Sequence, residues 1–236
     1  MEKQDIRKYS AVQLKDWLGQ HGEQGFRAKQ IHEWLWKKSA LSFEQMTNLS
    51  LSTRELLNAH FEIRPLTVDQ QQRSNDGTIK SSFRLFDGNL VEGVLIPALR
   101  NDDRGDGPSD RMTACVSSQV GCSLTCKFCA TGYMDRKRNL DAAEIYDQVV
   151  AIDRQAKENY NVPLSNIVYM GMGEPLLNYK NVLESVDRIT SPDGLGMSPK
   201  RITVSTAGIA KMIRQLGDDS VKFNLALSLH AANDQK

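Results

Sequence analysis

The sequence feature that most constrains this chain is a short cysteine-rich loop bounded by Gly121 and Gly132. Three of the four cysteines fall in it with the spacing C-x3-C-x2-C, as Cys122, Cys126 and Cys129. A thiolate is a soft ligand, and one short loop can turn three thiolates onto a single metal centre. The two glycines permit the sharp backbone turns that such wrapping requires. The spacing therefore predicts a metal-binding loop.

The number of ligands separates two kinds of metal centre. A structural zinc site is closed by four protein ligands, so zinc would need Cys115 as the fourth. Three ligands from one loop instead suit an iron–sulfur cluster that keeps one iron open. The simpler interpretation, three small buried hydrophobic residues in a reducing compartment, is disfavoured because the cysteines are so crowded. We therefore expect the iron–sulfur cluster and keep zinc as the alternative.

Composition sets broad limits on the class of protein. Apolar residues make up 40% and charged residues 25% of the 236 residues, which is ordinary for a soluble globular chain of more than one structural unit. No apolar run could span a membrane, and the start lacks a secretory signal, so we expect a cytoplasmic protein. The formal charge is only +1, so any contact with nucleic acid requires a local patch. Arg136-Lys137-Arg138 is the sharpest candidate, with a solvated basic turn as the equal alternative.

Residues 1–64 predict a helical region. Ser10 can cap a first helix that ends near Gly19 and Gly22, residues 26–38 predict a second, and Ser52 with Glu55 has capping-box spacing for a third. Tryptophans at helical spacing are usually core residues, so we favour that role over stacking on bases. The apolar stripes expected to face the core are Val12, Leu14, Trp17 and Leu18, then Phe26, Ile31, Trp34 and Leu35, then Leu56, Leu57 and Phe61.

Residues 65–98 predict β-hairpins. Turn signals at 75–77 and 87–88 separate β-rich runs at 66–73, 78–86 and 90–97. Glu92 lies in the last run, where an outward, solvated side chain is the ordinary interpretation. The following stretch is rich in Asp, Gly, Arg and Asn, so we expect a flexible loop over 99–111 before the unit that holds the cysteines.

Residues 112–236 alternate strand and helix patterns, which predicts a parallel sheet with crossover helices. The expected strands are 112–116, 167–170, 202–205 and 223–229. Glycine and polar residues stand at the ends of three of these strands: Gly171–Glu174 follows the second strand, Ser205–Gly208 ends the third and Ser228–His230 ends the fourth. Because ligands bind at the carboxyl ends of parallel strands, we expect these residues to line one cavity.

The cysteine loop resembles the signature of the radical S-adenosylmethionine (SAM) superfamily, C-x3-C-x-aromatic-C, with Phe128 as the aromatic residue. Four blocks of the sequence are similar to the RlmN family of that superfamily: Cys115-Val-Ser-Ser-Gln-Val-Gly-Cys122, Gly171-Met-Gly-Glu-Pro-Leu176, Ser205-Thr-Ala-Gly208 and Ser228-Leu-His230. This resemblance covers the whole chain and implies a (β/α) radical SAM barrel preceded by a small helical accessory domain that helps to hold RNA. It also implies methylation of C2 of an adenosine in 23S ribosomal RNA (rRNA) and, in some members, in transfer RNA (tRNA). The Cfr-type C8 methyltransferases share most of these blocks.

The resemblance further implies individual roles. Cys122, Cys126 and Cys129 hold a [4Fe-4S] cluster that a flavodoxin-type donor reduces. SAM is held by Gly173, Glu174, Ser205, Ser228, Leu229 and His230; from the residues alone, the Glu174 carboxylate can accept from an ammonium or a hydroxyl group. Glu92 matches the proton acceptor. A cysteine near the C-terminus carries the methyl group and becomes bonded to RNA, and Cys115 matches the cysteine that resolves this intermediate by forming a disulfide.

Two features depart from the family pattern. No cysteine follows Cys129, and residues 112–236 supply fewer strand–helix units than the family's barrel needs. We therefore expect a fragment of a longer protein with an incomplete barrel, whose open parallel edge at 223–229 risks aggregation. A non-catalytic, zinc-stapled RNA-binding module remains the alternative from another functional class.

Overall fold

The computed structural model describes residues 3–99, 108–229 and 231. It divides into two compact units, one of Met1–Pro65 with Arg188–Met197 and one of Leu66–Asp187 with Ser198–Lys236. Across the described ranges, no helix has both the length and the apolar character needed to cross a membrane. The cysteine loop belongs to the second unit.

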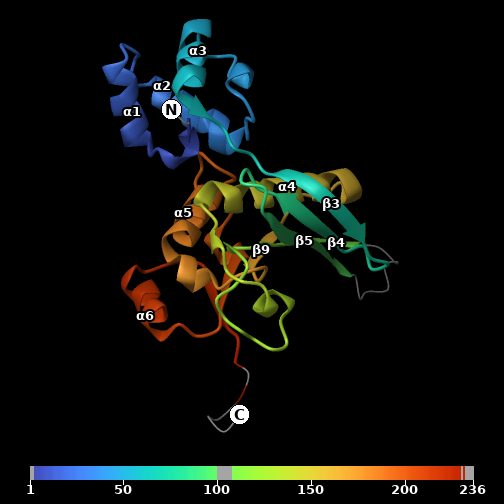
Figure 1. Cartoon of the computed structure of the whole chain (residues 1–236). Coiled ribbons are helices and arrows are strands. Elements are labelled where there is room, and N and C mark those ends of the chain that lie inside the picture. Colours follow the sequence, from blue (N-terminus) through green and yellow to red (C-terminus); the bar gives the residue numbers. More distant parts are fainter. Residues whose placement is uncertain (1–2, 100–107, 230, 232–236) are drawn as a thin grey trace. The chain divides into compact units, whose positions relative to one another are not determined.

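The first unit is built from short helices and one two-stranded parallel ladder (Figure 1). Its elements are β1 (Gln4–Asp5), a 3-10 turn (Ile6–Lys8), α1 (Ala11–Gln20), α2 (Arg27–His32), a π-helical turn (Glu33–Lys37), a 3-10 turn (Phe43–Gln45), α3 (Leu51–His60) and β2 (Phe61–Glu62). α1 begins at Ser10 as predicted, with Ser10 and Gln13 forming a reciprocal capping box. The predicted cap of α3 is wrong, because Ser50 and not Ser52 accepts from the Thr53 amide, at 3.1 Å.

The core of this unit follows most of the predicted apolar stripes. The stripe residues that are buried are Leu14, Leu18, Ile31, Leu35, Leu57 and Phe61. Val12 and Phe26 are exposed instead, so the stripe is narrower than predicted. Trp36 is buried, and half-buried Trp17 packs edge-on against Phe61, which supports a packing role for these two tryptophans.

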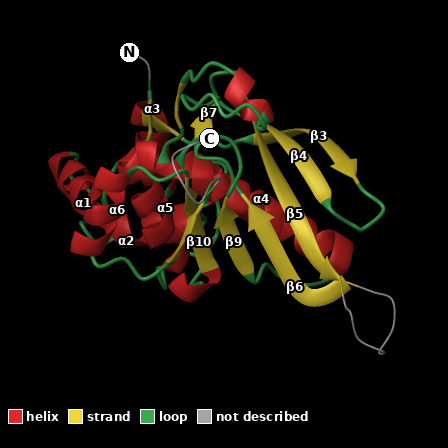
Figure 2. Cartoon of the chain, turned by 90° about the horizontal axis from the view of Figure 1, so that it is seen from below, coloured by secondary structure: helices red, strands yellow, loops and turns green. Residues whose placement is uncertain are grey.

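The second unit is organised on a seven-stranded mixed sheet in the order β11-β10-β9-β6-β5-β4-β3 (Figure 2). Its strands are β3 (Thr67–Arg73), β4 (Ile79–Arg84), β5 (Leu90–Leu99), β6 (Pro108–Cys115), β9 (Asn166–Tyr169), β10 (Ile202–Thr206) and β11 (Asn224–Leu227). β3 to β6 pair antiparallel, whereas β6, β9, β10 and β11 pair in parallel. The predicted α/β class and partial barrel are confirmed, and the sheet formed by the described residues is not closed.

The predicted loop over 99–111 and the strand boundary after it need correction. β5 extends to Leu99 and β6 begins at Pro108, so residues 108–111 belong to a strand. Residues 100–107 lie outside the described residues. β6 pairs with β5 on one side and β9 on the other, which joins the hairpins and the parallel strands in one sheet. The sequence Pro-Ser-Asp-Arg has little β propensity, and this pairing overrides it.

Helices cover one face of the sheet and leave the other open. The row Ile79, Leu95, Ala114, Ile167 and Ile202 runs across five strands and is almost completely buried. The adjacent row, Lys80, Val94, Cys115, Val168, Thr203 and Asn224, contains no buried residue. Successive strand residues point to opposite faces, so these rows mark a covered face and an open face.

The covered face packs against the predicted crossover helices. α4 (Ala142–Tyr160) is capped by Asp141 and buries Ile145, Val149 and Ile152. Gln155 of α4 donates to Ser81 Oγ at 2.9 Å on the covered face. The remaining elements are α5 (Tyr179–Thr190), α6 (Ala210–Asp218), β7 (Gln119–Val120), β8 (Arg138–Asn139) and 3-10 turns at Ala130–Tyr133, Pro175–Asn178 and Pro199–Arg201.

Candidate cofactor site

The cysteine loop is closed at its base by a short antiparallel ladder. β7 immediately precedes the loop and β8 follows it, with Gln119 opposite Asn139 and Val120 opposite Arg138. Gly121 has a positive φ of 72°, and a side chain there would collide with the backbone of Asp135. A side chain at Gly132 would likewise meet the backbone of Cys126. Both glycines therefore permit the close backbone approaches that the wrapping of this loop requires.

The loop forms one wall of a cavity of about 290 Å³ at the carboxyl ends of the parallel strands. Cys122, Cys126 and Cys129 all line it. The rest of the lining comes from the end of β10 and from residues after β9, β10 and β11, and it includes Gly173, Glu174, Ser205, Thr206, Ala207 and Ser228. The structure therefore brings together three cysteines and four of the residues predicted to bind SAM.

Gly173 is fixed by close contact with the strand before the cysteine loop. Its φ is 94°, and a Cβ atom there would lie 2.5 Å from Gln119 Cβ and 2.9 Å from the Gln119 backbone nitrogen. Gln119 Oε1 also accepts from the Glu174 amide at 2.9 Å. Sequence reasoning did not single out Gln119, although it lies within the block between Cys115 and Cys122.

The Glu174 carboxylate is held by the protein backbone. Its two oxygens accept from the Leu176 amide at 3.0 Å and from the Ala207 amide at 2.8 Å, and the residue is 4% exposed. These bonds connect the turn after β9 to the end of β10. We expected this carboxylate to accept hydrogen bonds only from a ligand. In the structure it also holds the cavity wall in place.

The remaining residues predicted to hold SAM lie in different settings. Ser205 Oγ and Ser228 Oγ are 3.3 Å apart across β10 and the end of β11, and both line the cavity. Leu229 is 74% exposed and is not among the described residues that line it. His230 lies outside the described residues.

Cys115 and Glu92 lie on the open face of the sheet, outside the described lining of this cavity. Val94 is the partner of Cys115 on the neighbouring strand, and Glu92 is two residues from Val94, so all three share a face. Burial raises the pKa of the Cys115 thiol to about 11. The Glu92 carboxylate is half-exposed and pairs with Lys80 Nζ at 2.7 Å.

The three thiols of the loop are soft ligands of the kind that binds a cluster, and they line one space. The described residues contain no group of three His, Cys, Asp or Glu side chains placed to hold one metal ion. A [4Fe-4S] cluster can take its thiolates on separate irons, so its ligands need only surround one space, as these three cysteines do. Burial raises the pKa of Cys122, and the nearby Cys126 and Cys129 raise it further. All four cysteines are free thiols, and the partner implied for Cys115 in a disulfide, the methyl-carrying cysteine, is not one of them.

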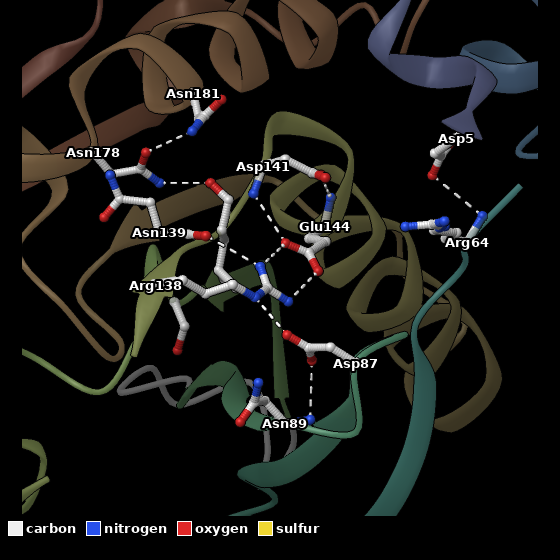
Figure 3. A network of polar contacts seen from close by, with 12 residues as sticks. Asp5, Arg64, Asp87, Asn89, Arg138, Asn139, Asp141, Glu144, Asn178 and Asn181 are labelled. Carbon is white, nitrogen blue, oxygen red and sulfur yellow. Dashed lines mark hydrogen bonds and ion pairs between the residues drawn. The ribbon is translucent and has the colours of Figure 1, made fainter. Parts of the chain in front are cut away.

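The basic turn after the loop is occupied by protein contacts (Figure 3). Arg138 donates to Asp87 at 2.6 Å and to both oxygens of Glu144 at 2.7 Å. The Arg138 guanidinium lowers the pKa of Asp87 to about 2. Arg138 thus ties the base of the cysteine loop to α4 and to the β4–β5 turn, which supports a structural role, and its expected phosphate contact stays a prediction. Lys137 donates to Asn89 Oδ1 at 3.0 Å and Arg136 to Asn139 Oδ1 at 3.2 Å.

Asn178 is another structural residue that sequence reasoning missed. Its side-chain nitrogen, Nδ2, donates to the backbone carbonyl oxygens of Ser118 and Leu140, both at 2.8 Å. These two carbonyls lie on either side of the cysteine loop, next to β7 and β8. Asn178 thus connects the turn after β9 to the base of that loop, a role for which the isolated sequence gives no signal.

Comparison with known families agrees with this geometry. Residues 4–63 match the family described as "Ribosomal RNA large subunit methyltransferase N-terminal domain", and residues 116–235 match "Radical SAM superfamily". A crystal structure of a radical SAM methyltransferase from Sphaerobacter thermophilus matches with a TM-score of 0.84 and 38% identity, covering 98% of this chain and 65% of that one.

Curated relatives extend the match to sequence. A probable dual-specificity RNA methyltransferase RlmN from Cytophaga hutchinsonii is 64% identical over 236 residues, which are all of this chain and 62% of the relative. The dual-specificity RNA methyltransferase RlmN from Geotalea uraniireducens is 45% identical, over all of this chain and 64% of the relative. The chain thus spans somewhat less than two thirds of these relatives. It belongs to the radical SAM superfamily and, within it, to the RlmN family.

Proposed function

We propose that this chain is part of a radical SAM methyltransferase that acts on RNA. The observation that carries the proposal is the single cavity in which Cys122, Cys126 and Cys129 face Gly173, Ser205 and Ser228. The names of the relatives, dual-specificity RNA methyltransferases, support RNA as the substrate class. The proposed target is C2 of an adenosine in 23S rRNA, with tRNA as a second substrate.

The proposed roles follow from where the residues lie. The three cysteines hold a [4Fe-4S] cluster, which when bound supplies one electron to start radical chemistry on SAM. Gly173 lets the turn after β9 pack against Gln119, because no side chain fits between the two residues, and SAM is proposed to bind against this turn. The hydroxyl groups of Ser205 and Ser228 offer donors and acceptors to the same ligand. Leu229 and His230 are proposed as further SAM-binding residues on the family resemblance alone.

Glu92 and Cys115 are proposed to act on the RNA side of the reaction. Both lie on the open face of the sheet, where Glu92 is exposed and Cys115 is partly buried, and an RNA base is proposed to approach them from this face. Glu92, whose Oε1 pairs with Lys80 in the structure, accepts the ring proton. Cys115 resolves the covalent protein–RNA intermediate by forming a disulfide with the methyl-carrying cysteine. We further propose a cytoplasmic location and a flavodoxin-type protein as the electron donor.

The cluster assignment is tested by anaerobic reconstitution with iron and sulfide. We expect about four irons per chain and absorption in the visible range. Cys126→Ala should abolish both, whereas Cys115→Ala should leave them unchanged. Stoichiometric zinc with no visible absorption, lost in both variants, would instead support the zinc-stapled module.

The substrate assignment is tested with methyl-labelled SAM, reductant and ribosomal RNA. A full-length version of the protein should place label on C2 of adenosine, and mass spectrometry of the nucleosides distinguishes C2 from the C8 product of a Cfr-type enzyme. Residues 1–236 alone should not turn over, because the proposed route needs two cysteines besides the cluster ligands and the sequence contains four in all. Labelled adenosine from residues 1–236 would contradict the cysteine roles.

A further inference from the structure

The first unit contains a cavity of about 420 Å³ that the proposed methyl transfer does not use. It lies between the start of α1, α2 with the π-helical turn, and the segment from Arg188 to Gly194, all of which belong to this unit. The lining is largely apolar, with Ala11, Val12, Ala28 and Trp36 among its residues. Cavities of this size and character commonly bind small molecules or parts of larger ligands.

A rare backbone feature forms one wall of this cavity. Residues Glu33–Lys37 form a π-helical turn, in which the Lys38 amide donates to the Glu33 carbonyl at 3.0 Å. Such turns are rare in proteins, and those that do occur are frequently found at functional sites. His32 and Trp36, four residues apart around this turn, both line the cavity, and the Arg188 guanidinium stacks over the Trp36 ring at 4.7 Å.

The charges around the cavity favour an anionic ligand. Lys15, Lys29 and Arg188 line it, with Asp193 as the carboxylate among the described lining residues. Burial, together with the nearby Arg188, lowers the pKa of His32 to about 4, so His32 is neutral at pH 7. The net lining charge is therefore +2. Lys15 and Lys29 are exposed, so their ammonium groups can turn toward a ligand, and the Lys15 stem is held against Gly25.

We propose that this cavity binds a nucleotide unit, with the phosphate paired to Lys15 and Lys29 and the base on the apolar lining. A nucleotide combines a flat, weakly hydrated ring with an anionic group, which matches an apolar cavity with a cationic edge. The unit can be a free mononucleotide or one residue of an RNA strand. The proposal does not depend on the proposed methyl transfer, because no residue of the cysteine-lined cavity takes part.

The test titrates uridine 5′-monophosphate and a uridine hexanucleotide into the full chain. Uridine is chosen because an adenine nucleotide could also enter the proposed SAM site. The readout is the indole N–H signal of Trp36 in an NMR spectrum, assigned with Trp36→Phe. We expect saturable shifts of this signal and not of the Trp34 signal. Binding of the hexanucleotide at least tenfold more tightly identifies RNA as the source, whereas equal or weaker binding identifies the free nucleotide.

Matched lysine variants decide whether the cavity is responsible. Lys15→Gln and Lys29→Gln should each weaken binding about tenfold, since a charge-assisted hydrogen bond contributes on that scale. Lys37→Gln, an exposed lysine of the same unit outside the described lining, should leave it unchanged. The proposal fails if neither ligand shifts the Trp36 signal or if the three variants behave alike. It also fails if inorganic phosphate binds as tightly as the nucleotide.

Discussion

At Gly173 the backbone conformation and the neighbouring strand both exclude a side chain. In Gly173→Ala the new methyl group would clash with the Gln119 backbone, and the positive φ would cost further energy. Gly88 also has a positive φ, of 80°, but open space surrounds it, so Gly88→Ala carries the φ cost without a clash. We expect Gly173→Ala to weaken SAM binding to the reconstituted protein more than tenfold, measured by calorimetry, and Gly88→Ala to leave it unchanged. Equal affinities for the two variants would show that the Gly173–Gln119 contact does not shape the site.

Cys115 is a thiol whose burial keeps it protonated at neutral pH. With a pKa of about 11, its thiolate at pH 8 is about a hundredfold scarcer than that of an unperturbed cysteine. In a variant with Cys122, Cys126 and Cys129 changed to Ser, we expect slow alkylation of Cys115 by iodoacetamide that still accelerates between pH 9 and pH 11. Mass spectrometry follows the reaction, and the protein unfolded in urea gives the unperturbed rate. A plateau already reached at pH 9 would contradict the raised pKa.

Residue roles differ in how far the sequence reveals them. The three cysteines are predictable because they lie within eight residues and their spacing is chemically specific. The hydrogen bonds of Glu174 are not predictable from the sequence, since one of the donors, the Ala207 amide, is 33 residues away. The role of Arg138 was equally hidden in the sequence. Its basic neighbours suggest a contact with RNA, but its partner in the structure, Asp87, lies 51 residues earlier in the chain. Charges and carboxylates take their roles from partners that only the fold brings near.

Among the elements, α3 offers a direct test of which serine caps a helix. Ser50→Ala removes an acceptor for the Thr53 amide and should lower the free energy of unfolding of this unit by about 1 kcal/mol. Ser52→Ala, one residue into the helix and exposed, should change it by less than about 0.5 kcal/mol. Urea unfolding followed by far-UV circular dichroism measures both. The reverse order would restore the cap predicted from sequence.

Elements with a strong periodic pattern were predictable, and those set by tertiary contacts were not. α4 combines an Asp141 cap with an apolar stripe, and both appear in the structure. The π-helical turn at Glu33–Lys37 has no distinct pattern, because its apolar residues also fit an α-helix. The early start of β6 comes from pairing with β5, which a single strand's residues cannot reveal.

At the scale of the whole chain, the described sheet has β11 at one edge, paired only with β10. Leu225 is 41% and Leu227 55% exposed on this strand. An exposed apolar edge can pair with another copy, so we expect concentration-dependent self-association in light scattering. Changing both leucines to Lys should raise the concentration at which it begins at least tenfold. Leu41→Lys, an equally exposed leucine of the first unit, should have no effect. Unchanged association in the double variant would exclude this edge.

The order of the strands also has a consequence for when a cluster could be inserted. β3 to β6 pair with neighbours in sequence, so they can form early, while β9 must cross over α4 to reach β6. The cysteine loop lies inside that crossover, and Asn178 and Gln119 connect its base to the turn after β9. During synthesis, all three cysteines therefore emerge before the chain segment that completes their cavity. The loop would reach its final conformation only after β9 has docked, so insertion of the proposed cluster would be a late step in the folding of this chain.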